Sequence, residues 1–138
     1  MSAKVLIIDD EPDVAAYLAA ALKANGHSPS VAHSAESGLE LLHRVRPDLI
    51  CLDIMMPRES GMSLYVRLKK DSEYQSIPVV IVSGVSQDEQ LDFRGYVADK
   101  SVPPPDCYLE KPIKVDEFIK TIESLVALAG SAKRRARK

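Results

Sequence analysis

Two short aliphatic runs constrain the fold of this 138-residue chain more than any other feature. VLII at residues 5–8 and VVIV at residues 79–82 contain only aliphatic side chains, most of them β-branched, with no polar residue between them. Strands of this composition are buried on both faces, as in a parallel sheet that is covered by helices. LICL at residues 49–52 and the weaker runs SVA at 30–32 and CYL at 107–109 predict three further strands.

Segments with helical spacing of apolar residues separate these runs. The clearest is the last, where apolar side chains recur at helical spacing from Val115 to Ala129. Pro12 suits the first turn of another helix, and Ser34 can cap the start of the next one. Helices are predicted over residues 12–25, 35–46, 61–70 and 115–129, with a less regular one near 87–99.

The alternation of strands and helices predicts an α/β fold, a doubly wound (βα)5 arrangement with helices on both faces of a five-stranded parallel sheet. Because crossovers between parallel strands are right-handed, few strand orders remain, and the flavodoxin-like order 2-1-3-4-5 suits five strands. The length is that of about one domain, so we expect a single folded domain over residues 3–129.

The composition argues against several classes of protein. No apolar run approaches the ~20 residues of a membrane span, and the first residues reach two acids before any long apolar stretch. Neither a membrane span nor a secretory signal is therefore predicted. Cys51 and Cys107 have no cysteine or histidine at metal-ligand spacing, and we interpret them as buried free thiols in a reducing cytoplasm.

Charge is distributed unevenly along the chain. Five of the 18 basic residues lie in the last six positions, KRRARK, whereas all 20 acidic residues precede them. An acidic body is not typical of a nucleic-acid-binding protein. We interpret residues 130–138 as a disordered basic tail, and contact of this tail with nucleic acid, an anionic membrane or an acidic partner is the alternative.

Polar side chains follow four of the five predicted strands. Asp9 and Asp10 follow the first strand, Asp53 the third, Ser83 the fourth and Lys111 the fifth. The carboxyl ends of parallel strands meet at one edge of the sheet, where ligands bind in such folds. Each residue alone has an ordinary structural explanation, but the agreement of four strand ends predicts a functional site.

The clustered carboxylates in this set require a compensating charge. Two like charges about 4 Å apart repel by roughly 4 kcal/mol at an effective dielectric near 20. Oxygen ligands without histidine or cysteine favour Mg²⁺, with Mn²⁺ as the alternative. A carboxylate beside such an ion can attack phosphorus, and an ammonium and a hydroxyl can stabilise the transferred oxygens. Asp53, Lys111 and Ser83 supply these three groups.

Four sequence motifs, one at each of four predicted strands, together resemble those of a known protein family. They are VLIIDDEP at the first strand, LDIMMPRESG at the third, VSG at the fourth and YLEKP at the fifth. Together and in this order they are specific, and the chain resembles the receiver domain of two-component response regulators over about residues 3–128. This resemblance implies that Asp53 is the phosphoacceptor, and that Asp9, Asp10, Asp53 and the backbone carbonyl of Met55 hold Mg²⁺.

The resemblance also implies roles for the remaining strand-end residues. Ser83 matches the hydroxyl that turns toward the phosphoryl group, and Lys111 matches the lysine that pairs with the phosphoryl oxygens. Tyr108 matches the aromatic residue that rotates inward, although a partly buried strand aromatic is an equal alternative. The Lys111–Pro112 bond is expected to be cis. Glu11 is interpreted as a charge at the start of a helix.

The implied function is that of a stand-alone receiver and phosphorylation-controlled binding switch, not an enzyme. Its partners would be a sensor histidine kinase or a histidine phosphotransfer protein, together with a downstream protein target, and the chain would be a monomer or weak dimer. The alternatives are a phosphate shuttle in a phosphorelay and a receiver cut from a longer regulator. The segment 84–106 is longer than is usual in the family, which leaves the partner surface open.

Two other functions fit the residues less well. An aspartyl-phosphate phosphatase commonly needs a second acid two residues after its nucleophile, where this chain has Met55. A flavodoxin-like cofactor binder needs a phosphate-cradling loop after the first strand, whereas the sequence DDEP repels phosphate unless a cation intervenes.

Overall fold

A computed structural model describes residues 2–54, 61–83 and 99–136, with side chains described as far as residue 130. Its core is one parallel sheet in the order β2-β1-β3-β4-β5, as the sequence predicted. The flavodoxin-like strand order and the α/β class are therefore confirmed. The strands are β1 (Lys4–Ile8), β2 (Ser28–Ala32), β3 (Leu49–Asp53), β4 (Val79–Ser83) and β5 (Cys107–Glu110).

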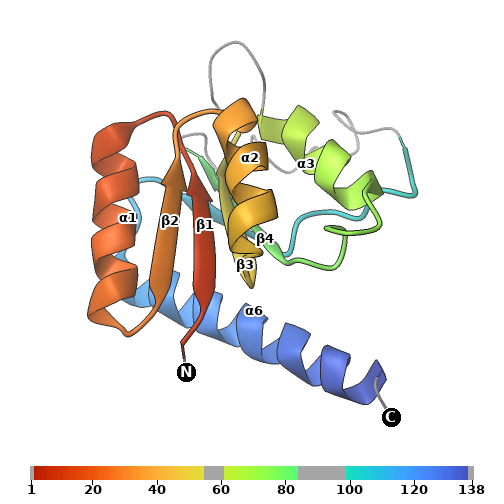
Figure 1. The fold of residues 1–138 in the computed structure, drawn as a ribbon. Coiled ribbons are helices and arrows are strands. Elements are labelled where there is room, and N and C mark those ends of the chain that lie inside the picture. The colour runs from red at the N-terminus through yellow and green to blue at the C-terminus, as the bar shows by residue number, and fades with distance from the viewer. Residues whose placement is uncertain (1, 55–60, 84–98, 137–138) are drawn as a thin grey trace.

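Helices cover both faces of this sheet (Figure 1). Helices α1 (Pro12–Ala24) and α6 (Val115–Ala136) pack on one face, and α2 (Ala35–Val45) and α3 (Gly61–Lys70) pack on the other. The less regular helix expected near 87–99 falls mostly outside the described residues.

Successive side chains of β1 enter opposite layers of the core, as the geometry of a strand requires. Leu6 and Ile8 pack against α2 and α3, whereas Val5 and Ile7 pack against α1 and α6. Strands β3 and β4 are buried at every position. The central strands are therefore fixed on both faces, and each fully buried Leu or Ile contributes roughly 1.5–3 kcal/mol.

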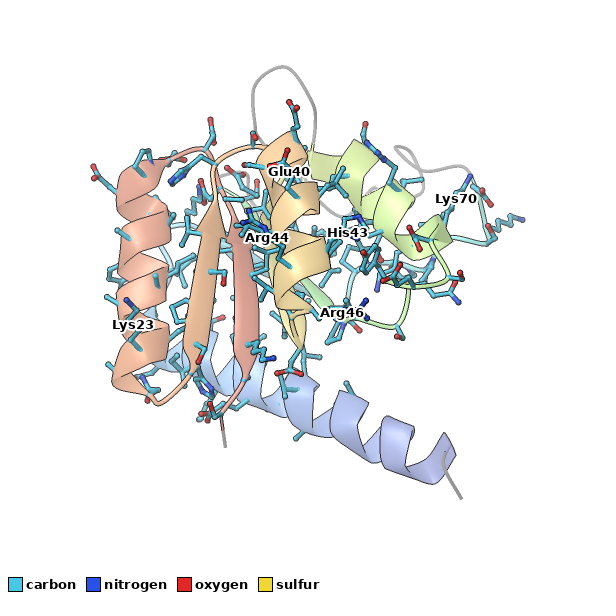
Figure 2. The ribbon with its side chains drawn as sticks, in the orientation of Figure 1. Lys23, Glu40, His43, Arg44, Arg46 and Lys70 are labelled. Carbon is cyan, nitrogen blue, oxygen red and sulfur yellow. The ribbon has the colours of Figure 1, made fainter. Side chains whose placement is uncertain are left out.

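The chain between β4 and β5 is anchored where the structure describes it. Val102 is fully buried in the core beneath α3, and the hydroxyl of Tyr65 on α3 donates to the carbonyl oxygen of Pro103 at 2.6 Å. Lys70, labelled in Figure 2, forms an ion pair with Asp99 at 2.8 Å. Residues 99–103 are therefore attached to α3 before the chain enters β5.

Helix α6 is longer than the sequence analysis indicated. It continues to Ala136, where the sequence predicted a disordered tail from residue 130. At about 1.5 Å per residue its 22 residues span roughly 33 Å, and its C-terminal half extends past the sheet (Figure 1). Leu128, on this half, is 67% exposed. No helix within the described ranges is both long and apolar enough to cross a membrane.

Candidate functional site

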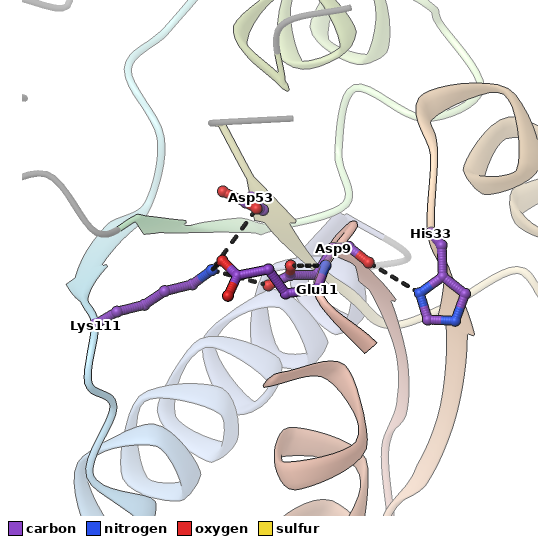
Figure 3. Close-up of polar contacts among 5 residues, drawn as sticks. All are labelled: Asp9, Glu11, His33, Asp53 and Lys111. Carbon is purple, nitrogen blue, oxygen red and sulfur yellow. Dashed lines mark hydrogen bonds and ion pairs between the residues drawn. The ribbon is translucent and has the colours of Figure 1, made fainter. Parts of the chain in front are cut away.

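The residues that follow the strands meet at one edge of the sheet. Asp9 follows β1, Asp53 and Ser83 are the last residues of β3 and β4, and Lys111 follows β5. Asp9, Asp53 and Ser83 are almost completely buried, with at most 2% of each residue exposed. Figure 3 shows Lys111 reaching across this edge toward Asp9 and Asp53. The predicted gathering of these strand-end residues is thus present.

Four carboxylates form the centre of this site. One oxygen from each of Asp9, Asp10, Glu11 and Asp53 lies within 4.8 Å of the others. Asp10 is half-buried and Glu11 is exposed. Four negative charges at this spacing, two of them buried, repel one another strongly unless cations balance them.

Lys111 is the ammonium that the described residues place inside this cluster. Its Nζ lies 2.8 Å from Glu11 Oε1, 3.3 Å from Asp9 Oδ2 and 3.7 Å from Asp53 Oδ2. Burial by itself would lower the pKa of Lys111, but the hydrogen bond that Lys111 donates to Glu11 and the charges of Asp53 and Asp9 outweigh it, so the pKa is raised. Lys111 therefore carries its positive charge in the resting site.

The contact between Glu11 and Lys111 was missed by the sequence analysis, which interpreted Glu11 only as a charge at the start of a helix. Glu11 is indeed the N-cap of α1, but its side chain makes no capping hydrogen bond. The two residues are 100 positions apart, and no local pattern reports such a pair. Its carboxylate thus belongs to the site rather than to the helix terminus.

Asp9 is held in place from several sides. Its N–H donates to Ala32 O at 3.0 Å, and its carbonyl oxygen accepts from His33 Nδ1 at 3.0 Å. Its Oδ1 accepts from the N–H of Glu11 at 2.9 Å. Oδ2 is buried and, among the described residues, has the Lys111 ion pair but no hydrogen bond. The orientation of Asp9 thus leaves one oxygen for a ligand.

His33 was not expected near the site. His33 directly follows β2, in the first half of the sequence, and no role at the site was predicted for it. Its bond to the Asp9 carbonyl supports the backbone of the cluster and does not reach the carboxylates (Figure 3).

Gly61, the first residue of α3, packs directly against the end of β3. A Cβ at this position would lie 2.2 Å from the carbonyl oxygen of Asp53 and 2.6 Å from the Cα of Ile54. The N–H of Gly61 also donates to Ile54 O at 3.3 Å. Only a residue without a side chain permits this approach. Gly61 therefore allows the start of α3 to pack against the main chain of Asp53 and Ile54.

The remaining predicted site residues lie on β4 and β5. Ser83 is fully buried, and its carbonyl oxygen accepts from the N–H of Lys111 at 2.8 Å. Tyr108 is partly buried, and its hydroxyl has no hydrogen-bond partner in the described part of the chain; burial raises its pKa. The Lys111–Pro112 bond is cis, as predicted. Met55 lies outside the described residues.

The chemistry of the donor set fits a hard divalent cation. All four clustered groups are carboxylates, the group typical of Mg²⁺ and Mn²⁺ sites, and one of their buried oxygens has no hydrogen bond within the described part of the chain. Lys111 neutralises one of the four acids, and a divalent ion would neutralise two more.

Comparison with known proteins agrees with this geometry. The chain is 34% identical to Protein PilH of Pseudomonas aeruginosa over 125 residues, which cover 91% of this chain and 98% of that protein. It is 29% identical to the phosphate regulon transcriptional regulatory protein PhoB of Escherichia coli over 126 residues, 91% of this chain but about half (52%) of PhoB.

Solved structures show the same fold. NtrX from Brucella abortus superposes with a TM-score of 0.83 at 28% identity, over 99% of this chain and 30% of NtrX. The family model of the response regulator receiver domain matches residues 5–123. With its site at the carboxyl edge of a 2-1-3-4-5 sheet, the chain belongs to the response regulator receiver domain family.

Proposed function

We propose that Asp53 accepts a phosphoryl group from a phosphohistidine and that this modification switches protein binding. The observation that carries the proposal is the position of Asp53, buried at the end of the central strand β3 with Lys111 Nζ 3.7 Å from its Oδ2. A carboxylate can attack phosphorus, and a neighbouring ammonium can stabilise the charge on the transferred oxygens.

Asp53 suits this role better than the neighbouring acids. Asp10 lies nearer the surface than Asp53. Asp53 instead stands between the strands that supply Asp9 and Ser83. A phosphoryl group on Asp53 would therefore lie between the strand that supplies Asp9 and the strand that supplies Ser83.

Asp9, Asp10 and Asp53 would hold Mg²⁺, or Mn²⁺ in its place, and family resemblance adds the backbone carbonyl of Met55. The cluster of carboxylate oxygens within 4.8 Å supports this assignment. When bound, the ion would neutralise charge on the phosphoryl oxygens. The residues of the chain position the acceptor oxygen and supply the other compensating charges.

In the transfer step an oxygen of the Asp53 carboxylate forms a bond to phosphorus. The P–N bond of the phosphohistidine breaks, and the departing imidazole nitrogen keeps its electron pair. Lys111 pairs with one phosphoryl oxygen and the Ser83 hydroxyl donates to another. Asp53 is followed two residues later by Met55, where an aspartyl-phosphate phosphatase commonly has its second acid, so a switch is favoured over an enzyme of that class.

The consequence of phosphorylation would be a shift between two conformations of the face carrying Ser83 and Tyr108. The buried hydroxyl of Tyr108, without a partner in the described residues, supports a ring that can change position. The partners would be a cytoplasmic sensor histidine kinase or histidine phosphotransfer protein and a downstream protein, with the chain acting as a monomer or weak dimer.

Two related roles remain within the same chemistry. The chain can serve as a phosphate shuttle between histidine-bearing partners, or as the receiver part of a longer regulator, because PhoB is about twice the length of the matched segment. Nucleic acid would be reached only through the basic residues 133–138.

Intact-mass spectrometry after incubation with acetyl phosphate and Mg²⁺ tests the proposal. We expect one phosphoryl adduct in the native chain and none in Asp53→Asn or in the presence of EDTA. An adduct that persists in Asp53→Asn would assign the acceptor to another residue and overturn the proposal.

A further inference from the structure

Two contacts join the start of α1 to the chain that follows β5. Glu11 Oε1 accepts from Lys111 Nζ at 2.8 Å, and the hydroxyl of Tyr17 donates to the carbonyl oxygen of Ile113 at 3.2 Å. The residues of both contacts line a groove of about 530 Å³, and Asp13 also lines it. Residues 111–113 are thus attached to α1 at two points, one ionic and one neutral.

The side chain of Glu11 is not needed by its own helix. An N-cap side chain commonly accepts a hydrogen bond from the first turn, and Glu11 makes none. Its main-chain N–H is already used by Asp9 Oδ1. Although Glu11 is 58% exposed, its carboxylate turns toward the site and contacts an ammonium that is only 15% exposed (Figure 3).

The distances around Lys111 show which acid holds it. Its shortest contact is with Glu11, and its longest with Asp53, the proposed phosphoacceptor. We propose that Glu11 is a positioning residue that holds Lys111 back from Asp53 in the resting state. This inference rests on the proposed function, because it assigns Glu11 a part in the regulation of the same site.

Phosphorylation would then involve an exchange of partners. A phosphoryl group on Asp53 offers anionic oxygens to Lys111, and Lys111 must give up Glu11 to reach them. Breaking the contact between Glu11 and Lys111 costs free energy, and this cost weakens the binding of a phosphoryl group at the site. After the exchange the Glu11 carboxylate is released at the N-terminus of α1, and the contact of Tyr17 remains.

Binding of beryllofluoride, a phosphoryl mimic, tests this exchange. Its affinity is measured with Mg²⁺ at a concentration that saturates each variant, established beforehand by calorimetric titration. We expect Glu11→Gln to bind the mimic roughly five- to tenfold more tightly than the native chain, because a neutral amide holds the ammonium less strongly. Asp13→Asn is the matched control: it removes one exposed acid from the same helical turn without touching Lys111, and its affinity should change less than twofold.

Two results would overturn the proposal. Equal effects of Glu11→Gln and Asp13→Asn would mean that Glu11 contributes only general negative charge. Weaker binding of the mimic by Glu11→Gln would mean that Glu11 assists the phosphorylated state instead of restraining Lys111.

A second measurement reads the contact without phosphoryl chemistry. Thermal unfolding in EDTA is compared for the native chain, Glu11→Gln, Lys111→Met and the double variant. If Glu11 holds Lys111, the Glu11 substitution lowers the Tm in the native background and no longer does so when Lys111 is absent. Additive effects would overturn the proposal. The native chain could fail to bind the mimic and still show this coupling between Glu11 and Lys111. That result would contradict the proposed function but would support the contact between Glu11 and Lys111.

Discussion

The N–H of Lys111 donates to the carbonyl oxygen of Ser83 at 2.8 Å, which ties together the two residues whose side chains flank the proposed phosphoryl position. The bond continues the pairing of β4 with β5 by one residue beyond the sheet. Because it uses only main-chain atoms, either side chain can be replaced without removing it. The ammonium and the hydroxyl can therefore be tested separately on an unchanged backbone.

The first prediction concerns the hydroxyl of Ser83. Ser83→Ala should weaken beryllofluoride binding in the presence of Mg²⁺ about tenfold, since one hydrogen bond to a charged oxygen is lost. Ser83→Thr restores a hydroxyl and should recover most of this loss. The measurement is a binding titration, accompanied by thermal unfolding to show that both variants are folded. Equal weakening in the two variants would show that the hydroxyl has no part in binding.

The second prediction uses two glycines in contrasting surroundings. Gly61→Ala should lower the free energy of unfolding by about 1–3 kcal/mol or more, because its Cβ would meet the main chain of Asp53. Gly130 lies inside α6, and among the described residues no atom outside its own stretch of helix lies within 4 Å of the position that a Cβ would take. Gly130→Ala should therefore stabilise the chain by roughly 0.5–1 kcal/mol.

Urea unfolding of the two glycine variants measures both effects. Phosphorylation of Gly61→Ala by acetyl phosphate should also be impaired, since the contact lies at the acceptor residue itself. If both substitutions had the same sign of effect on stability, the close approach of Gly61 to β3 would not be present in solution.

The fold and much of the site could be predicted from the sequence because both depend on strand ends. The runs before Asp9, Asp53 and Ser83 are short and apolar and predict parallel strands, so the polar side chains that follow them must meet at one edge of the sheet. Local sequence could not predict the pairing of Glu11 with Lys111, because it depends on how two loops bring side chains together across 100 positions.

The length of α6 is a second feature that the sequence did not predict correctly. The apolar stripe ends at Ala129, so residues 130–138 were interpreted as a disordered basic tail. Gly130 and Ser131, at the start of this segment, also have low helix propensity. The helix nevertheless continues to Ala136 through a stretch of alanine, lysine and arginine, which are strong helix formers. A single weak position inside such a helix costs about 1 kcal/mol, and the neighbouring residues outweigh it.

The third prediction concerns the two thiols. Burial raises the pKa of Cys51, which is fully enclosed, and also raises that of half-buried Cys107. A raised pKa leaves less thiolate at any given pH, so alkylation of the native chain near pH 8 should be slow. We expect Cys107 to react first, and Cys51 to react only at the rate of unfolding. Mass spectrometry of peptides after timed alkylation gives both rates, and equal labelling of the two thiols in the native chain would contradict the burial of Cys51.

The last prediction concerns His27, which is buried at the end of the sheet opposite the site. Its Nδ1 accepts from the N–H of Ala3 at 3.0 Å, and its Nε2 therefore carries the proton that is donated to Glu123 Oε2 at 2.8 Å. His27 thus connects the start of β1 to α6. His27→Ala would leave the Ala3 N–H without its acceptor and open a cavity, so the free energy of unfolding should fall by about 3 kcal/mol.

Glu123→Gln is the matched control for His27→Ala. The amide oxygen can still accept from Nε2, and the Glu123 side chain is 42% exposed, so the loss should stay below about 1 kcal/mol. Urea unfolding monitored by circular dichroism measures both values. Because His27 lies far from the carboxylate cluster, phosphorylation of Asp53 in folded His27→Ala should proceed at the native rate. A loss of less than 1 kcal/mol in His27→Ala would mean that the connection between β1 and α6 contributes little to the fold.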